Sequence, residues 1–262
     1  YNYLEIRSKL KNLNHSFKTE SDTEVILESY KRYGENCVKY FEGMWALVIF
    51  DIHEKRLFFS RDRFGEKPLF YFFNKNSFYF GSEPKFIFNL LGKKIEPNMK
   101  QIQRLLFNGF RSIYKKKQTF FSDLHELKPA SNIILHKPEK FEIKKYWSLK
   151  FNPIADTLKN VKENLKVLIN NSLKLRLRSD VPIAFCLSGG IDSSTLVSMA
   201  KRNGVDVKTF SIIDSDERYD ESKNINSLVE SLDLVTRRDR EGRIPRDLQG
   251  TWDWTVRHGK VS

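Results

Sequence analysis

The segment with the clearest chemical potential is residues 183–194, "IAFCLSGGIDSS". Apolar residues run up to a cluster of Ser, Gly and Asp, and a helical pattern, "TLVSMAKRNG", follows at once. Where a strand passes into a helix, the first amides of the helix have no internal partner and lie at the positive end of its dipole. The segment therefore predicts an anion-binding loop.

The residue types of this loop favour a pyrophosphate over other anions. Gly189 and Gly190 allow left-handed backbone and the close approach of an oxyanion. Three hydroxyl donors surround the same position: Ser188, Ser193 and Ser194. The loop lacks the lysine of a G-x-x-x-x-G-K-[ST] motif, and Asp192 would repel a phosphate unless Mg²⁺ bridged the two. The alternative is a plain turn followed by an N-cap.

The elements around this loop read as strand, loop, helix and strand from Pro182 onward: "VPIAFCL", "SGGIDSS", "TLVSMAKRNG" and "VDVKTFSII". An apolar strand of this kind, buried on both faces, belongs to a parallel sheet. An amphipathic helix from about Thr157 to Leu177 precedes it. The second half of the chain therefore predicts the start of an α/β domain.

The first half of the chain predicts an α+β domain. A helix is expected over residues 1–18, and a second one begins at Ser21 or Asp22, with Glu24 at capping-box distance, and ends at Gly34. Four short aromatic runs between residues 43 and 82 predict an antiparallel meander. A helix after Pro97 and a strand hairpin over residues 130–147 complete this half.

Four parts follow from these patterns. They are a domain at 1–148, a polar linker at 149–157, the beginning of a second domain at 158–234, and an atypical tail at 235–262. The tail is rich in arginine where the rest of the chain prefers lysine, and it has no sustained apolar period. It is expected to be foreign sequence, such as a frameshift, a vector-derived end or a fusion scar, and the alternative is a genuine basic tail.

Composition excludes several classes of protein. The chain has 262 residues and a formal charge of +13, but its lysines are scattered, so the charge predicts a solvated surface or one cleft for a polyphosphate rather than nucleic-acid binding. Neither a signal peptide nor an apolar run of about 18 residues is present, which favours a cytoplasmic protein without membrane contact. Cys37 and Cys186 lie in separate apolar segments and are expected to be reduced core residues.

The motif "SGGIDSS" resembles the pyrophosphate loop of the ATP pyrophosphatases. Four blocks of the first half resemble, in order, the glutaminase domain of glutamine-hydrolysing asparagine synthetases: "SDTEVILESYKRYGENCVKYFEGMWALVIFD", "LFFSRDRFGEKPLFY", "FGSEPKFIF" and "ELKPASNIIL...YW". The resemblance covers roughly residues 1–234.

The resemblance implies an N-terminal-nucleophile glutaminase fold, two stacked antiparallel sheets between helices, followed by an α/β parallel-sheet adenylating domain. It also implies a reaction in which ammonia released from glutamine attacks an ATP-activated aspartate to give asparagine, glutamate, AMP and pyrophosphate. Glutamine, aspartate, ATP and Mg²⁺ are the implied partners and cofactors, and the full-length protein is expected to form a homodimer.

The resemblance also assigns residues. The ATP and pyrophosphate site would comprise Leu187, Ser188, Gly189, Gly190, Asp192, Ser193 and Ile212, with Asp192 as the metal partner. Asp22 would hold the α-amino group of glutamine, and it could also cap its helix. A further block is expected to be mainly structural, with its charges in an internal salt-bridge network: Arg61, Asp62, Arg63, Gly65, Lys67 and Pro68.

The chain departs from the family at both ends. The family's catalytic N-terminal cysteine is absent, and Cys37 cannot replace it, because that nucleophile uses its own α-amino group as base. The expectation is a fragment of an asparagine synthetase that is inactive alone. Two alternatives stay open, an amidotransferase with another acceptor (peptide, cell-wall or β-lactam-forming) and a non-catalytic nucleotide-binding remnant.

Overall fold

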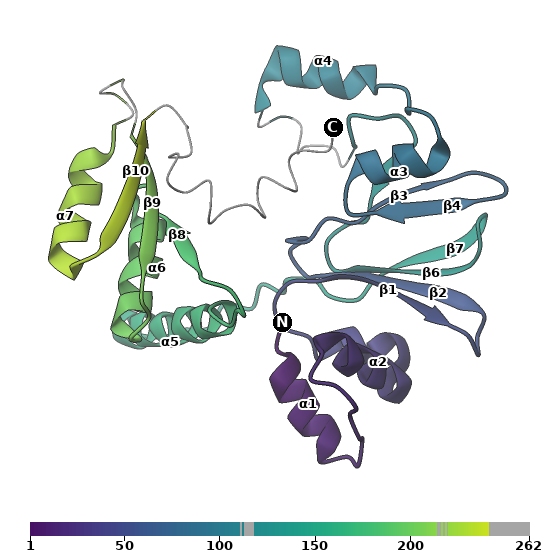
Figure 1. Ribbon diagram of the computed structural model, residues 1–262, viewed down its shortest axis with the longest axis horizontal. Coiled ribbons are helices and arrows are strands. Elements are labelled where there is room, and N and C mark those ends of the chain that lie inside the picture. Colours follow the sequence, from purple (N-terminus) through teal and green to yellow (C-terminus); the bar gives the residue numbers. More distant parts are fainter. Residues whose placement is uncertain (111, 113–117, 214–215, 217, 219, 241–262) are drawn as a thin grey trace. The chain divides into compact units, whose positions relative to one another are not determined.

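The computed structural model describes residues 1–110, 112, 118–213, 216, 218 and 220–240 (Figure 1). Most of the tail that was predicted to be foreign, residues 241–262, therefore lies outside the described residues. The chain divides into two compact units, Tyr1–Ile154 and Ala155–Ser262, and the division falls within the expected linker. None of the described helices is long and apolar enough to cross a membrane.

Unit 1 is a mixed α/β domain. Its helices and 3₁₀ helix are α1 (Tyr3–Lys11), α2 (Asp22–Tyr33), η1 (Gly34–Lys39), α3 (Pro84–Leu91) and α4 (Met99–Asn108). Its strands are β1 (Ala46–Asp51), β2 (Arg56–Arg61), β3 (Phe70–Phe73), β4 (Phe78–Gly81), β5 (His125–Glu126), β6 (Ser131–Lys137) and β7 (Lys140–Lys145). The first helix is shorter than expected, because the chain turns at Asn14, where φ is +65°.

The strands of unit 1 form two antiparallel sheets, with the orders β1-β2-β6-β7 and β4-β3-β5. The prediction of one meander was wrong, because the segment after β2 carries the chain into the second sheet. The expected hairpin of β6 and β7 is confirmed. Figure 1 shows the layers of this unit in sequence: α1 and α2, the four-stranded sheet, the three-stranded sheet, and then α3 and α4.

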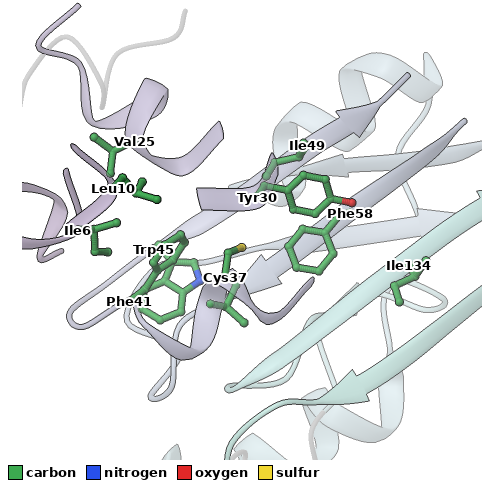
Figure 2. Packing of buried hydrophobic residues seen from close by; sticks show 11 residues of the cluster. Ile6, Leu10, Val25, Tyr30, Cys37, Phe41, Trp45, Ile49, Phe58 and Ile134 are labelled. Carbon is green, nitrogen blue, oxygen red and sulfur yellow. The ribbon is translucent and has the colours of Figure 1, made fainter. Parts of the chain in front are cut away.

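Two apolar clusters hold these layers together. The first lies between α1, α2, η1 and the four-stranded sheet, and Phe58 and Ile134 reach it from the strands (Figure 2). The second lies between the two sheets, where Phe59 meets Phe78 and Phe80 with ring centroids 5.5 and 5.0 Å apart. Phe58 belongs to the first cluster and Phe59 to the second, because successive side chains of a strand point to opposite faces.

Unit 2 contains α5 (Leu158–Arg176), β8 (Ala184–Cys186), α6 (Ile191–Arg202), β9 (Lys208–Ile213), α7 (Ser222–Leu232) and β10 (Val235–Arg240). Its three strands are parallel and ordered β10-β9-β8. The predicted strand, loop, helix and strand are confirmed. The expected tail boundary coincides with the start of β10, so residues 235–240 belong to the sheet.

The core of unit 2 lies on one face of its sheet. Leu187, Val197 and Ile225 are fully or almost fully buried there, together with Leu173 of α5. Cys186 is exposed, so the expectation of a core cysteine on a strand buried on both faces was wrong. Since alternate residues of a strand face opposite sides, Cys186 lies on the face away from the cluster that buries Leu187.

Candidate functional site

A pocket of about 490 Å³ opens in unit 1 between α2 and the start of β1. Residues 44–49 form one wall, the first two turns of α2 form another, and Lys67 and Pro68 close a third side. Among the described residues that line it, Asp22 is the one acid and Lys67 the one base. A pocket of this size with one charge of each sign suits a small zwitterion.

Asp22 is positioned by the N-terminus of α2. The Ser21 hydroxyl accepts a hydrogen bond from the Thr23 amide at 3.1 Å, which caps the helix. The Tyr1 hydroxyl donates to the Asp22 carbonyl at 2.7 Å, and Arg7 donates to the Ser21 carbonyl at 2.9 Å. Three contacts thus hold the backbone around a side chain that is exposed to solvent.

The Asp22 carboxylate is available to a ligand. Within the described part of the chain, its one contact is the Thr23 hydroxyl at 3.5 Å, which is long for a hydrogen bond. An exposed carboxylate beside a pocket can accept hydrogen bonds from an ammonium group. Asp22 was expected to bind glutamine and was also considered as the cap of its helix. In the structure Ser21 is the capping residue, and Asp22 is the first residue of the helix.

The block of residues 61–68 lies next to this pocket, and its last two residues, Lys67 and Pro68, line it. Arg61 is 6% exposed and donates to three backbone carbonyls, those of Gly65, Lys67 and Leu127, and it pairs with Glu126 at 2.8 Å. The block was expected to be a salt-bridge network. The structure instead shows that its charged groups bind mainly to the backbone.

Cys37 lies in η1 and has no exposed surface. Burial raises the pKa of its thiol to about 12. Since the thiolate is the nucleophilic form, this residue is not poised for catalysis, and its assignment to the core is confirmed.

The predicted anion loop of unit 2 joins β8 to α6. Gly189 has φ of +79°, and a Cβ there would lie 3.1 Å from the Asn224 Cβ and 3.3 Å from the Glu221 carbonyl oxygen. Glycine is therefore required for both conformation and space. Gly190, in contrast, has φ of −71° and serves as the N-cap of α6, so only one of the two glycines is left-handed.

The hydroxyl groups of Ser188 and Ser193 converge on this helix terminus. Their oxygens are 3.1 Å apart, the Ser188 amide donates to the Ser193 hydroxyl at 3.3 Å, and that hydroxyl donates to the Gly190 carbonyl at 3.2 Å. Asp192 lies in the first turn of α6. These groups fit an oxyanion, because hydroxyl donors and the first amides of the helix share one location.

The other residues predicted for this site lie at the same end of the sheet. Leu187 is buried, and its amide donates to the Phe210 carbonyl of β9 at 2.8 Å. Ile212 follows two residues after Phe210 and is 74% exposed. Among the described residues, no group of three or more His, Cys, Asp or Glu could hold a metal ion.

Sequence reasoning missed several residues of the unit 1 pocket, such as Tyr1, Met44 and Ser82. Tyr1 and Ser82 lie far apart along the chain, and the packing of helices on sheets brings them to one pocket. No local pattern identifies them.

Unit 1 is a mixed α/β domain with antiparallel sheets and a small, mainly apolar pocket that carries one acid and one base, an architecture consistent with glutamine amidotransferase domains. A family model described as a glutamine amidotransferase domain matches residues 1–147. The chain belongs to the glutamine amidotransferase domain family. A second model, described as a domain of unknown function, matches residues 211–262.

The sequence similarity to known proteins extends beyond unit 1. A putative asparagine synthetase [glutamine-hydrolyzing] 2 of Methanocaldococcus jannaschii is 40% identical over 88% of this chain and 44% of its own length. Asparagine synthetase [glutamine-hydrolyzing] 1 of Bacillus subtilis is 32% identical over 81% of this chain and 33% of its own length. Amidase chry2 of Gibberella zeae is 29% identical over 76% of this chain and 29% of its own length. The chain therefore spans less than half the length of these curated relatives.

Proposed function

We propose that the natural protein carrying this chain is a glutamine-dependent asparagine synthetase. The observation that carries the proposal is the similarity to proteins of that name, which extends over most of the chain and includes both units. The overall reaction consumes glutamine, water, aspartate and ATP and yields glutamate, asparagine, AMP and pyrophosphate. Water replaces the amide nitrogen of glutamine, and the released ammonia replaces the activated oxygen of aspartate.

Unit 1 would bind glutamine in the pocket beside α2. The Asp22 carboxylate would accept hydrogen bonds from the α-ammonium group, an arrangement that its exposure and sparse contacts support. Cys37 would take no part, because its buried thiol has a pKa near 12. The N-terminal-nucleophile fold belongs to this proposal, and the stacking of two antiparallel sheets between helices supports it.

Unit 2 would begin the adenylating domain. ATP would supply the leaving group for the side-chain carboxyl of aspartate. The hydroxyl groups of Ser188 and Ser193 and the amides of the 188–190 loop would bind its pyrophosphate portion, with Mg²⁺ at Asp192. The backbone of Leu187 and Ile212 would lie beside the adenine, which their location at one end of adjacent strands supports.

The first test uses the natural full-length gene product and follows three products: glutamate from glutamine, and asparagine and pyrophosphate from aspartate and ATP. Activity with glutamine, and with ammonium in its place, is the expected result. Absence of glutamate release would overturn the glutaminase part. Glutamine hydrolysis without any aspartate-dependent pyrophosphate would overturn the choice of aspartate.

Asp22→Asn tests the pocket itself. We expect the KM for glutamine to rise at least about tenfold, since a charge-assisted contact contributes roughly 1.5–3 kcal/mol. Ammonium-dependent synthesis should stay unchanged, because it bypasses this pocket. Asp123→Asn is the matched control: Asp123 lies outside the pocket and has φ of +58°, which asparagine also tolerates. An unchanged KM in Asp22→Asn would refute the assignment.

A second candidate function is an amidotransferase with a different acceptor carboxyl. Two fungal relatives carry the name amidase rather than asparagine synthetase, and these names support this second candidate. Replacing aspartate with other carboxylic acids in the pyrophosphate assay distinguishes the two.

A further inference from the structure

Asp62 makes an unusual set of contacts for a buried carboxylate. Its side chain has no exposed surface, and its two oxygens accept four backbone hydrogen bonds. One oxygen accepts from the amides of Phe64 at 3.1 Å and Glu66 at 2.9 Å. The other accepts from the amides of Lys67 at 3.0 Å and Trp45 at 3.3 Å.

Two of these four amides belong to residues that line the unit 1 pocket. Trp45 lies in the wall formed by residues 44–49, and Lys67 closes the side next to it. The backbone of Asp62 strengthens the link, since its amide donates to the Trp45 carbonyl at 3.0 Å. Its carbonyl accepts from the Ala130 amide at 2.8 Å, which fixes this junction to the residue before β6.

The stability of this junction depends on the negative charge of Asp62. A buried carboxylate is costly unless hydrogen bonds compensate it, and hydrogen bonds to an ionised acceptor are stronger than neutral ones. An asparagine has one acceptor oxygen and an NH₂ group. Depending on its orientation, that NH₂ group would face either the Trp45 and Lys67 amides or the Phe64 and Glu66 amides. The neutral oxygen that remains would accept weaker hydrogen bonds from the other pair, so the connection between the two walls would be broken or weakened.

We propose that Asp62 is a positioning residue of the pocket: its buried carboxylate holds the Trp45 wall against Lys67 and so sets the width at which the pocket takes its amino-acid substrate. The side chain does not line the pocket and acts through the backbone of both walls. This inference rests on the proposed function, because glutamine is the substrate whose binding it predicts.

The test compares the glutamine kinetics of wild type and Asp62→Asn in the full-length gene product. We expect the KM for glutamine to rise about tenfold, the size of effect typical of losing hydrogen bonds to a charged group. The kcat for glutamate release should change less than about twofold, and ammonium-dependent synthesis should not change. If Asp62→Asn does not fold, Asp62→Glu keeps the charge but displaces it by one methylene, and the same rise in KM is expected.

Asp51→Asn is the matched control. Asp51 lies at the other end of β1, outside the pocket, and its carboxylate also accepts from a turn amide, that of Glu54, at 3.1 Å. Its second oxygen accepts from the Tyr30 hydroxyl at 3.1 Å. The KM for glutamine should stay within about twofold of wild type. An unchanged KM in Asp62→Asn, or an equal rise in Asp51→Asn, would overturn the proposal.

Hydrogen exchange separates this proposal from the proposed function. The amides of Trp45, Glu66 and Lys67 should exchange faster in Asp62→Asn than in wild type, and not in Asp51→Asn. If the wild type releases no glutamate from glutamine, the proposed function fails, and these exchange rates alone decide whether Asp62 holds the walls. Unchanged exchange at all three amides would overturn the positioning role.

Discussion

Gly65 is the residue that allows the turn next to the pocket to close. Its φ is +70°, and a Cβ at this position would lie 2.9 Å from the Pro129 Cγ and 3.1 Å from the Arg61 Cζ. The Arg61 guanidinium cannot move aside without losing its hydrogen bonds to buried backbone carbonyls. Conformation and space therefore both demand glycine, and the same turn carries three amides that bind the Asp62 carboxylate.

Gly65→Ala is predicted to lower the free energy of unfolding of unit 1 by about 3 kcal/mol, as the sum of a left-handed alanine and an overpacked contact. Urea denaturation measures this. Gly92→Ala is the control, because Gly92 has a similar φ of +67°, and a Cβ added there would meet no atom within 4 Å. It should cost about 1 kcal/mol. Equal losses in the two variants would show that the contact with Pro129 and Arg61 has no energetic weight.

At the scale of elements, the start of α2 is tied to the chain before it by Glu24. Its carboxylate accepts from the amides of Lys18 and Thr19, both at 2.8 Å, and from the Thr19 hydroxyl at 2.7 Å. The capping-box spacing predicted a bond to the Ser21 amide, but the side chain reaches further back. The result is a closed loop before the helix that presents Asp22.

These hydrogen bonds, first of all the one from the Lys18 amide, lower the pKa of Glu24 from 4.5 to about 2. Because the pKa is lower in the folded state, the carboxylate stabilises the fold fully above about pH 4.5, and this contribution is lost as the pH falls toward 2. The stability difference between wild type and Glu24→Gln should therefore shrink over this range. Urea midpoints measured at pH 6 and at about pH 2.5 test it, and a constant difference would contradict the assignment.

Local sequence signals were sufficient to predict several helices and strands. The cap and the terminal glycine of α2, the apolar period of α5, and the strand, loop and helix around Gly189 each depend on neighbours in the sequence. The assignment of strands to sheets was not accessible, because β2 pairs with β6, and Leu57 lies opposite Leu135. Pairing over such distances depends on the whole domain.

The candidate sites also divide into features that local sequence predicts and features that depend on the whole domain. The anion loop was predicted as a local motif, and the structure brings Ser188 and Ser193 together as expected. Asp22 was predicted only through the family resemblance, and the part played by Asp62 emerged from four contacts that no pattern encodes. The exposure of Cys186 was missed because an apolar run does not reveal whether a sheet is covered on one face or two.

At the scale of the whole chain, the two units are connected by a segment without helix or strand, residues 146–157. It carries large apolar side chains in solvent, since Leu149 is 81%, Phe151 92% and Ile154 78% exposed. Unit 1 contains two buried clusters and unit 2 contains one of its own. Each unit should therefore be stabilised by its own core.

Limited proteolysis tests this organisation. Proteases cut where an exposed stretch of backbone can enter the active site without unfolding a core. Lys150 is exposed and is the one Lys or Arg between Lys145 of β7 and Lys159 of α5. Among the described residues, the earliest tryptic cleavage is expected after Lys150, which releases a fragment that mass spectrometry identifies by its C-terminus at residue 150. Lys150→Gln should abolish this fragment, whereas Lys145→Gln should not. Cleavage inside β1, β2 or β6 before Lys150 would instead mean that unit 1 depends on unit 2 for its stability.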